Sequence, residues 1–189
     1  MSSHHIVREK QEPALLIFDL DNFDSELLGQ LLEWSPTVIV TQPMAEKLNS
    51  YGIKIDWIIA GDNKEEIQSD VKVIPGNNKA PLLSALKFLT DNNYPAVNII
   101  IDTLNLDYYH PFIDKINLVI FYNGQKIYPV TSGFSKWKPA GEILKILSDD
   151  ATIKVSGLTP LTGHNYKTTN DGFFTILLNQ PYTFIAEGL

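Results

Sequence analysis

The stretch at residues 38–62, VIVTQPMAEKLNSYGIKIDWIIAGD, contains the unit on which the fold is built. The apolar runs at 37–40 and 57–60 are rich in the β-branched residues typical of buried strands. Between them a proline stands where a helix can begin, and Met44–Ser50 is expected to be helical up to a turn at Gly52. This order of strand, helix and strand predicts two parallel strands with a helix packed against the sheet.

The same alternation continues on both sides of this stretch. Asp24 or Ser25 can cap a helix whose leucines at 27, 28, 31 and 32 form one apolar stripe, and a second helix is expected over Pro81–Thr90. Further strands of this parallel sheet are expected at Ala14–Phe18, Val71–Ile74 and Val97–Ile101.

Beyond about residue 115 the pattern changes to short strands separated by turns, of which Asn123-Gly124 is the clearest hairpin signal. We therefore predict an antiparallel β-sandwich in this half, with a domain boundary between Tyr109 and Lys115. Its strands are expected at Leu118–Tyr122, Lys126–Val130, Ile143–Leu147, Thr152–Val155, Phe173–Leu178 and Tyr182–Ala186.

Composition excludes several classes of function. The 189 residues contain no cysteine, so disulfides, thiolate metal sites and thiol catalysis are all excluded. A net charge of −7 without a dense basic cluster argues against a nucleic-acid partner. The N-terminal residues lack the apolar core of a signal peptide, and no apolar run has the length of a membrane span. We expect a cytoplasmic protein with no membrane partner.

Two acidic loops follow predicted strands, where open α/β sheets bind their ligands: Asp19-Leu20-Asp21 and Gly61-Asp62-Asn63. Carboxylates in such loops suit Mg²⁺ bound together with substrate phosphates. The same residue types also make ordinary turns and helix caps, so a structural role remains the alternative for each loop.

One interpretation of these loops is a phosphatase. The segments LLIFDLDNF, TVIVTQP and WIIAGDN resemble motifs of the haloacid-dehalogenase-like phosphatases, which implies Asp19 as nucleophile and Asp21 as general acid. Only about 40 residues separate Asp19 from Asp62, which leaves too little room for that family's intervening strands. Loss of p-nitrophenyl phosphate hydrolysis in Asp19→Asn would support this alternative, and no effect would remove it.

A longer resemblance runs through residues 14–189. The segment at 38–62 is similar to the region of thiamin pyrophosphokinases that leads through a Gly-Ile-x-Pro-Asp element to a strand ending in an acidic motif. NGQKIYPV, FSKWKPAGEILKILSDDATIKVSGLTPL and TTNDGFFTILLNQPYTFIAEG resemble that family's thiamin-binding β-domain. The matching positions are Leu48, Gly52, Ile53, Asp56, Ile58, Ile59, Ser156, Gly157, Leu158, Thr169 and Asn170.

The resemblance implies a Rossmann-like, mostly parallel α/β domain at residues 14–112 after a tail at 1–13, and a thiamin-binding-like β-sandwich at 113–189. It implies the reaction of ATP with thiamin to give AMP and thiamin diphosphate, with Mg²⁺, at a site shared across a homodimer. The residues it assigns are Asp62 to catalysis and Mg²⁺, Asn78 and Lys79 to the nucleotide phosphates, and Ser156, Thr169 and Asn170 to thiamin. Trp137 or Tyr166 could add an aromatic wall for the thiamin ring.

The chain departs from that family's motifs on the metal side. Its acidic Asp-Gly-Ala turn is Gln42-Pro43-Met44 here, and Asp62 matches only if one residue is inserted before Gly61. The family's Lys-Asp-x-Thr-Asp run is replaced by residues 77–81, NNKAP, and a loop ending in Asp-His is shortened to Asp102–His110.

Because pyrophosphoryl transfer depends on positioning and charge neutralisation, these losses predict a weak or lost activity, as in a pseudoenzyme. The alternatives left open are activity through rearranged ligands such as Glu65, Glu66 or Asp70, and a non-catalytic module that binds thiamin or a nucleotide.

Overall fold

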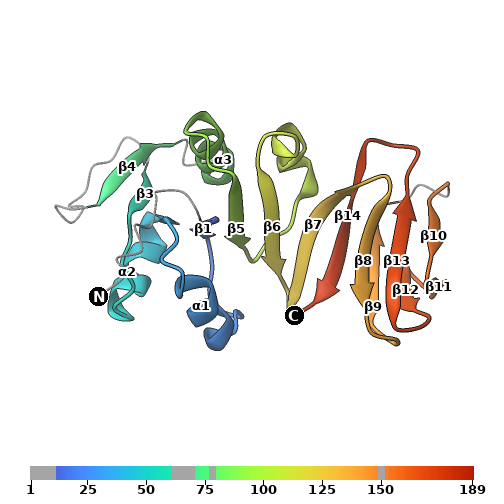
Figure 1. Cartoon of the computed structure of the whole chain (residues 1–189). Helices are drawn as coiled ribbons and strands as arrows, with labels where there is room; N and C mark the ends of the chain where they lie inside the picture. The colour runs from blue at the N-terminus through green and yellow to red at the C-terminus, as the bar shows by residue number, and fades with distance from the viewer. Residues whose placement is uncertain (1–11, 61–70, 77–79, 149–151) are drawn as a thin grey trace, which may run out of the picture. The chain divides into compact units, whose positions relative to one another are not determined.

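The computed structural model describes residues 12–60, 71–76, 80–148 and 152–189 (Figure 1). Contacts divide the chain into two compact units between Leu118 and Val119, within strand β6 (Asn117–Tyr122). The described elements of the first unit are β1 (Ala14–Ile17), α1 (Ser25–Leu32), β2 (Val38–Thr41), α2 (Gln42–Ser50), β3 (Trp57–Ala60), β4 (Lys72–Pro75), α3 (Pro81–Asp91), β5 (Ala96–Ile100), η1 (Leu106–Tyr108) and η2 (His110–Phe112).

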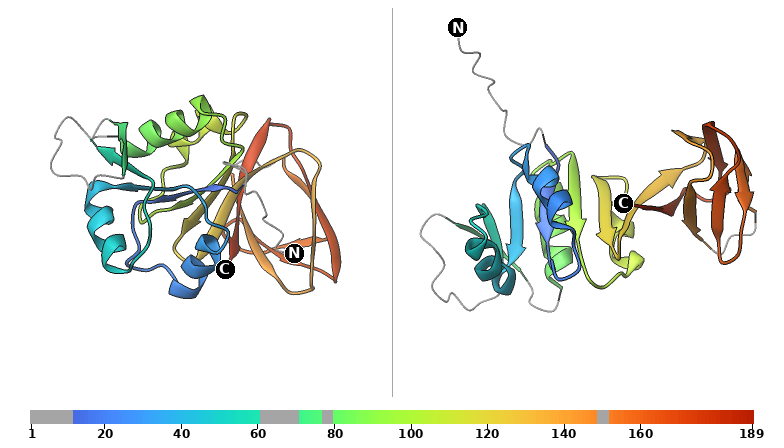
Figure 2. Two further views of the ribbon diagram at one scale, coloured as in Figure 1. Left: turned by 60° about the vertical axis from the view of Figure 1, so that its left-hand side comes forward. Right: turned by 90° about the horizontal axis from the view of Figure 1, so that it is seen from below.

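The first unit is built on the parallel strands β5-β1-β2-β3-β4, in that order across the sheet. The chain advances through β1, β2 and β3 and then returns from β4 to β5. Because such crossovers are right-handed, α1 and α2 cover one face and α3 covers the other (Figures 1 and 2). All four residues of the central strand β1 are buried, as its uninterrupted apolar sequence ALLI predicts.

Helix α1 begins where the sequence provides a cap. The Oδ1 atom of Asp24 accepts a hydrogen bond from the backbone N of Leu27 at 2.8 Å, which confirms the predicted cap of α1. Helix α2 starts at Gln42, two residues earlier than expected, because Pro43 fits the first turn. The expected apolar stripe of α1 is narrower than predicted: among its four leucines only Leu28 is buried.

The second unit contains two antiparallel sheets. One has the order β6-β7-β14-β9-β12-β11, and the other is the three-stranded sheet β10-β13-β8. Their bounds are β7 (Gln125–Thr131), β8 (Phe134–Lys138), β9 (Ile143–Leu147), β10 (Lys154–Ser156), β11 (Leu158–Pro160), β12 (Asn165–Thr168), β13 (Gly172–Leu177) and β14 (Tyr182–Gly188). The sequence pattern did not indicate β8, β11 or β12.

One hydrophobic core joins these two sheets. Val130, Ile146 and Ile185 come from the larger sheet, and Phe174 and Ile176 come from β13. The ring of Phe134 on β8 lies 6.0 Å from that of Phe174, centre to centre. The strand pairings confirm the predicted antiparallel character of this half, and both sheets supply inward side chains to the same core.

A carboxylate is buried beside this core. Glu187 on β14 is 4% exposed, and its Oε2 accepts a hydrogen bond from Nζ of Lys136 on β8 at 2.6 Å. The Nζ of Lys138 lies 3.6 Å from Oε1, and Lys136 also donates to the hydroxyl of Tyr128 at 3.0 Å. Burial and then the negative charge of Glu187 raise the pKa of Tyr128. Both lysines of β8 thus face inward to neutralise one carboxylate.

Tyr109 gives a prediction about alkaline pH. Its ring is fully buried, its hydroxyl has no hydrogen-bond partner among the described residues, and burial raises its pKa. Above the ordinary tyrosine value of about 10 the unfolded chain loses a proton that the folded chain keeps, so stability falls as pH rises. Tyr109→Phe should raise the free energy of unfolding by about 1 kcal/mol at neutral pH and reduce this alkaline loss.

Urea unfolding at a series of pH values measures both effects. Tyr51→Phe is the matched control, because Tyr51 is 61% exposed. Removing its hydroxyl should change neither the free energy of unfolding at neutral pH nor its decrease at alkaline pH. If the free energy of unfolding fell equally at alkaline pH in Tyr109→Phe and in the unchanged protein, Tyr109 would not be the cause of that decrease.

Candidate functional site

Acidic side chains follow two strands of the parallel sheet where these strands end. Asp19 lies two residues after β1 and Asp102 two residues after β5. The Oδ1 atom of Asp19 accepts hydrogen bonds from the backbone N of Leu20 at 2.7 Å and of Asp21 at 3.1 Å. Asp19 therefore closes a local turn. This is the structural role that the sequence analysis kept as the alternative to metal binding. Its assignment as a phosphatase nucleophile stays a prediction.

The second carboxylate of this loop is already neutralised. Lys47 on α2 donates a hydrogen bond to Oδ1 of Asp21, and this bond is the main reason that the pKa of Lys47 is raised. The pair ties the loop after β1 to the helix after β2. Asp21 therefore contributes little net negative charge at this edge of the sheet.

Several sequence-predicted site residues lie outside the described part of the chain: Asp62, Asn78 and Lys79, together with the alternative ligands Glu65, Glu66 and Asp70. Their assignments stay predictions. Within residues 12–60, 71–76, 80–148 and 152–189 no group of three or more histidine, aspartate or glutamate residues is placed to hold a metal ion.

Two helices begin at this edge with incompletely capped backbone N–H groups. Thr41 precedes α2 and Ala80 precedes α3, and neither makes a side-chain hydrogen bond to the first turn. Uncapped N–H groups and the positive end of the helix dipole favour an anion. This edge therefore offers electrostatics suited to phosphate, without a described carboxylate cluster for a metal.

In the second unit the structure brings together two segments for which the family resemblance implies thiamin binding. The carbonyl oxygen of Gly157 accepts a hydrogen bond from the backbone N of Thr169 at 3.1 Å. The hydroxyl oxygens of Thr159 and Thr169 lie 3.3 Å apart. Ser156 and Asn170 adjoin this contact in sequence and are exposed. The Ser-Gly-Leu turn and the Thr-Asn pair therefore form one exposed polar surface.

Sequence reasoning missed two residues that hold this surface in place. Thr168 is 2% exposed; its hydroxyl donates to the carbonyl oxygen of Pro139 at 2.7 Å and accepts from the backbone N of Glu142 at 2.9 Å. Asp171 accepts a hydrogen bond from the backbone N of Ala140 at 2.7 Å. Both flank Thr169 and Asn170, so they fasten that pair to the 139–142 loop. The polar run Thr-Thr-Asn-Asp was the only signal in the sequence.

Thr168→Val tests this fastening. The substitution keeps the shape of the side chain but leaves the carbonyl of Pro139 and the N–H of Glu142 without their partner, and we expect a loss of about 2 kcal/mol in the free energy of unfolding. Urea denaturation measures the loss. Thr159→Val, at an exposed position of β11, should change stability by less than about 0.5 kcal/mol. Equal effects of the two substitutions would contradict the role given to Thr168.

Ser156 shares a sheet face with an exposed aromatic pair. Trp137 on β8 is 54% exposed and lies directly opposite Phe173 on β13, which is 71% exposed. In the same three-stranded sheet Ser156 lies opposite Thr175, two residues from Phe173, so all these side chains are on the outer face. Tyr166, the other candidate for an aromatic wall, packs instead against the core. Trp137 therefore fits that role better than Tyr166.

Several solved structures with a similar arrangement of strands and helices carry the same enzyme name. Yeast thiamin pyrophosphokinase is 11% identical and has a TM-score of 0.68, covering 97% of this chain and 88% of its own. The enzyme from Candida albicans is 12% identical with a TM-score of 0.64, covering 94% and 89%. A probable thiamine pyrophosphokinase from Staphylococcus saprophyticus is 12% identical with a TM-score of 0.66, covering 93% and 98%.

The chain has the thiamin pyrophosphokinase fold. The resemblance drawn from sequence motifs is thus confirmed at the level of fold, over nearly the whole chain. No protein-family model matches the sequence, and no curated protein does. At such low identity, this similarity shows the fold of the chain. It does not show an activity or a ligand.

Proposed function

We propose that this chain is a diverged thiamin pyrophosphokinase-like protein that binds thiamin or a similar heterocycle, and whose pyrophosphoryl transfer is weak or absent. The observation that carries the proposal is the surface joining Ser156, Thr169 and Asn170 through the bond between Gly157 and Thr169. Hydroxyl and amide groups of this kind can hydrogen-bond an aminopyrimidine ring. The likeness of fold supports thiamin as the heterocycle to test first.

In this proposal the first unit binds ATP without an efficient metal site. The N-termini of α2 and α3 would face the nucleotide phosphates, helped by Asn78 and Lys79. In the family reaction the thiamin hydroxyl takes a pyrophosphoryl group from ATP and AMP leaves. Mg²⁺ would supply charge neutralisation in that reaction, and Asp62 is the carboxylate proposed for it. The pairing of Asp21 with Lys47 leaves one fewer free carboxylate in the loop after β1.

We extend the proposal to a cytoplasmic homodimer, since the resemblance implies a site shared between two copies. The structure adds one related finding: none of its described helices is long and apolar enough to cross a membrane. Sedimentation of the full chain with and without thiamin would test the dimer.

Thermal unfolding with thiamin, thiamin diphosphate, ATP, and ATP with Mg²⁺ tests the binding proposal. A ligand at 100 times its Kd should add about 2.7 kcal/mol of stability. We expect stabilisation by thiamin, reduced in Asn170→Ala and unchanged in Asn179→Ala, an exposed asparagine elsewhere in the second unit. Absence of any thiamin effect, or equal effects in both variants, would contradict the proposal.

A turnover assay separates binding from catalysis. With ATP, Mg²⁺ and thiamin we expect little or no thiamin diphosphate. Formation of product at an ordinary enzymatic rate would contradict the proposed loss of activity, and Asp62→Asn would then show whether Asp62 carries it. Thiamin binding without turnover would support a binding module built on the fold of this enzyme.

A further inference from the structure

A pocket of about 420 Å³ lies in the first unit, away from the edge where the candidate loops are found. It opens at the amino ends of the strands: Val38 is the first residue of β2, and Asp56 directly precedes β3. Thr41, at the other end of β2, is about 10 Å away along the strand. The pocket is therefore separate from the proposed nucleotide site.

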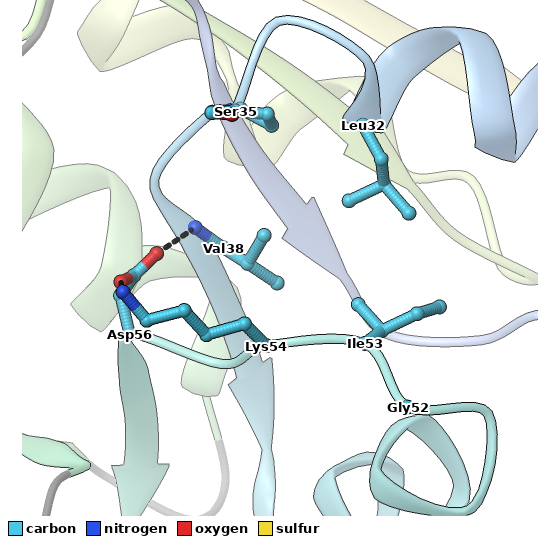
Figure 3. A pocket seen from close by; sticks show the side chains of 8 residues that line it. Leu32, Ser35, Val38, Gly52, Ile53, Lys54 and Asp56 are labelled. Carbon is cyan, nitrogen blue, oxygen red and sulfur yellow. Dashed lines mark hydrogen bonds and ion pairs between the residues drawn. The ribbon is translucent and has the colours of Figure 1, made fainter.

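Apolar side chains form about half of the pocket wall. Figure 3 shows the side chains of Leu32, Val38 and Ile53 around a common space, each from a different segment of the chain, and Pro36 adds to this wall. The apolar half of this space suits a branched or aromatic side chain better than a polar group. The pocket therefore selects for a small ligand with an apolar body.

Opposite charges lie side by side at the polar end of the pocket. The Oδ2 atom of Asp56 accepts a hydrogen bond from the backbone N of Val38 at 2.9 Å, so this carboxylate is held in place. The Nζ of Lys54 lies 3.6 Å from Oδ1 of Asp56, and the lysine side chain is 90% exposed while that of Asp56 is 31% exposed (Figure 3). A pair this exposed is weak, so a ligand can separate the two groups at little cost.

The backbone around the pocket is preformed. Ser35 and Gly52 both have positive φ angles, of 52° and 71°, and each donates its backbone N–H to a preceding helical carbonyl. The N–H of Ile53 bonds to the carbonyl of Leu48 at 3.1 Å, and that of Asp56 bonds to the carbonyl of Val38 at 3.1 Å. These bonds fix the segments that carry the walls, which lowers the ordering cost of binding.

We propose that this pocket binds a free α-amino acid with an apolar side chain. The ammonium group of such a zwitterion meets the fixed carboxylate of Asp56, its carboxylate meets the exposed ammonium of Lys54, and its side chain fills the space between Leu32, Val38 and Ile53. No simple anion or cation satisfies both charged groups at once. The inference is independent of thiamin binding, because it rests on other residues.

Calorimetry and backbone NMR of the full chain with L-leucine test the proposal. We expect saturable binding with shifts at the amides of Ser35, Ile53 and Asp56. 4-Methylpentanoate, which lacks the ammonium group, and 3-methylbutylamine, which lacks the carboxylate, should each bind about tenfold more weakly, the effect of one charge-assisted hydrogen bond. Equal binding of all three probes, or no binding of any, would overturn the proposal.

Lys54→Gln supplies the test within the protein. It should weaken leucine binding about tenfold and leave binding of 3-methylbutylamine unchanged, because only the ligand carboxylate loses its partner. Lys87→Gln is the matched control, since Lys87 forms a comparably exposed ion pair with Asp91 on α3 and should leave both affinities unchanged. Leucine affinity that does not respond to Lys54→Gln would also overturn the proposal.

Discussion

Gly157→Ala should destabilise the protein by about 3 kcal/mol and remove thiamin binding. A Cβ atom at this position would lie 2.8 Å from the carbonyl oxygen of Phe173 and 3.1 Å from Cα of Phe174, both backbone atoms that cannot turn aside. The residue also has a φ of 74°, which costs an L-amino acid about 1–2 kcal/mol. Overpacking adds about 1–3 kcal/mol. The clash would push the turn at Gly157 away from β13, and this turn follows Ser156 and accepts the hydrogen bond from Thr169.

Gly133→Ala separates these two contributions. Gly133 has a φ of 87°, but nothing lies within 4 Å of the point that a Cβ atom would occupy, so only the conformational cost of about 1 kcal/mol applies. Urea denaturation of both variants measures the difference, and calorimetry with thiamin measures the effect on binding. If both variants lost the same free energy of unfolding, the backbone around Gly157 would be able to move and accommodate a side chain.

Lys136→Met should cost about 3 kcal/mol, the low end of the range for breaking a buried ion pair. The substitution removes the 2.6 Å hydrogen bond to the carboxylate of Glu187, which is 4% exposed, and leaves Lys138 at 3.6 Å as the described cation beside it. It also removes the donor to the hydroxyl of Tyr128. The low end is appropriate because the side chain of Lys136 is 34% exposed, so part of its charge already meets water.

The double variant Lys136→Met/Glu187→Gln should recover most of this loss, because it removes the uncompensated charge. Lys87→Met is the matched control: its pair with Asp91 is exposed on α3, and we expect a loss below about 0.5 kcal/mol. Chemical denaturation of these variants and the unchanged protein measures each loss. A Lys136→Met variant within about 1 kcal/mol of the unchanged protein would contradict the role of this pair.

The first unit could be predicted well because its signals are local. Strand β3 has the predicted bounds Trp57–Ala60, and Asp24 caps α1 as expected, since a continuous apolar run and a capping carboxylate act within a few residues. The motif resemblance to thiamin pyrophosphokinases also led to the correct fold. The roles of Asp62, Asn78 and Lys79 stay predictions, because these residues lie outside the described part of the chain.

Strand β8 shows why the second unit was harder. Its sequence FSKWK alternates, but Lys136 and Lys138 face inward while Trp137 faces outward, the reverse of the usual pattern. Only Glu187, 51 residues later, makes that orientation favourable. Strand β11 has three residues and ends in a proline, so it carries no periodic signal of its own.

Local signals were enough to establish the class of each half, the cap of α1 and the polar segments at Ser156 and Thr169, because propensity, capping and turn chemistry act over a few neighbouring residues. Packing between distant segments was needed to establish that Gly157 and Thr169 are hydrogen-bonded, that Lys47 neutralises Asp21, and that Lys54 and Asp56 border a pocket. Such pairings depend on strand register and burial, which no short stretch of the chain specifies by itself.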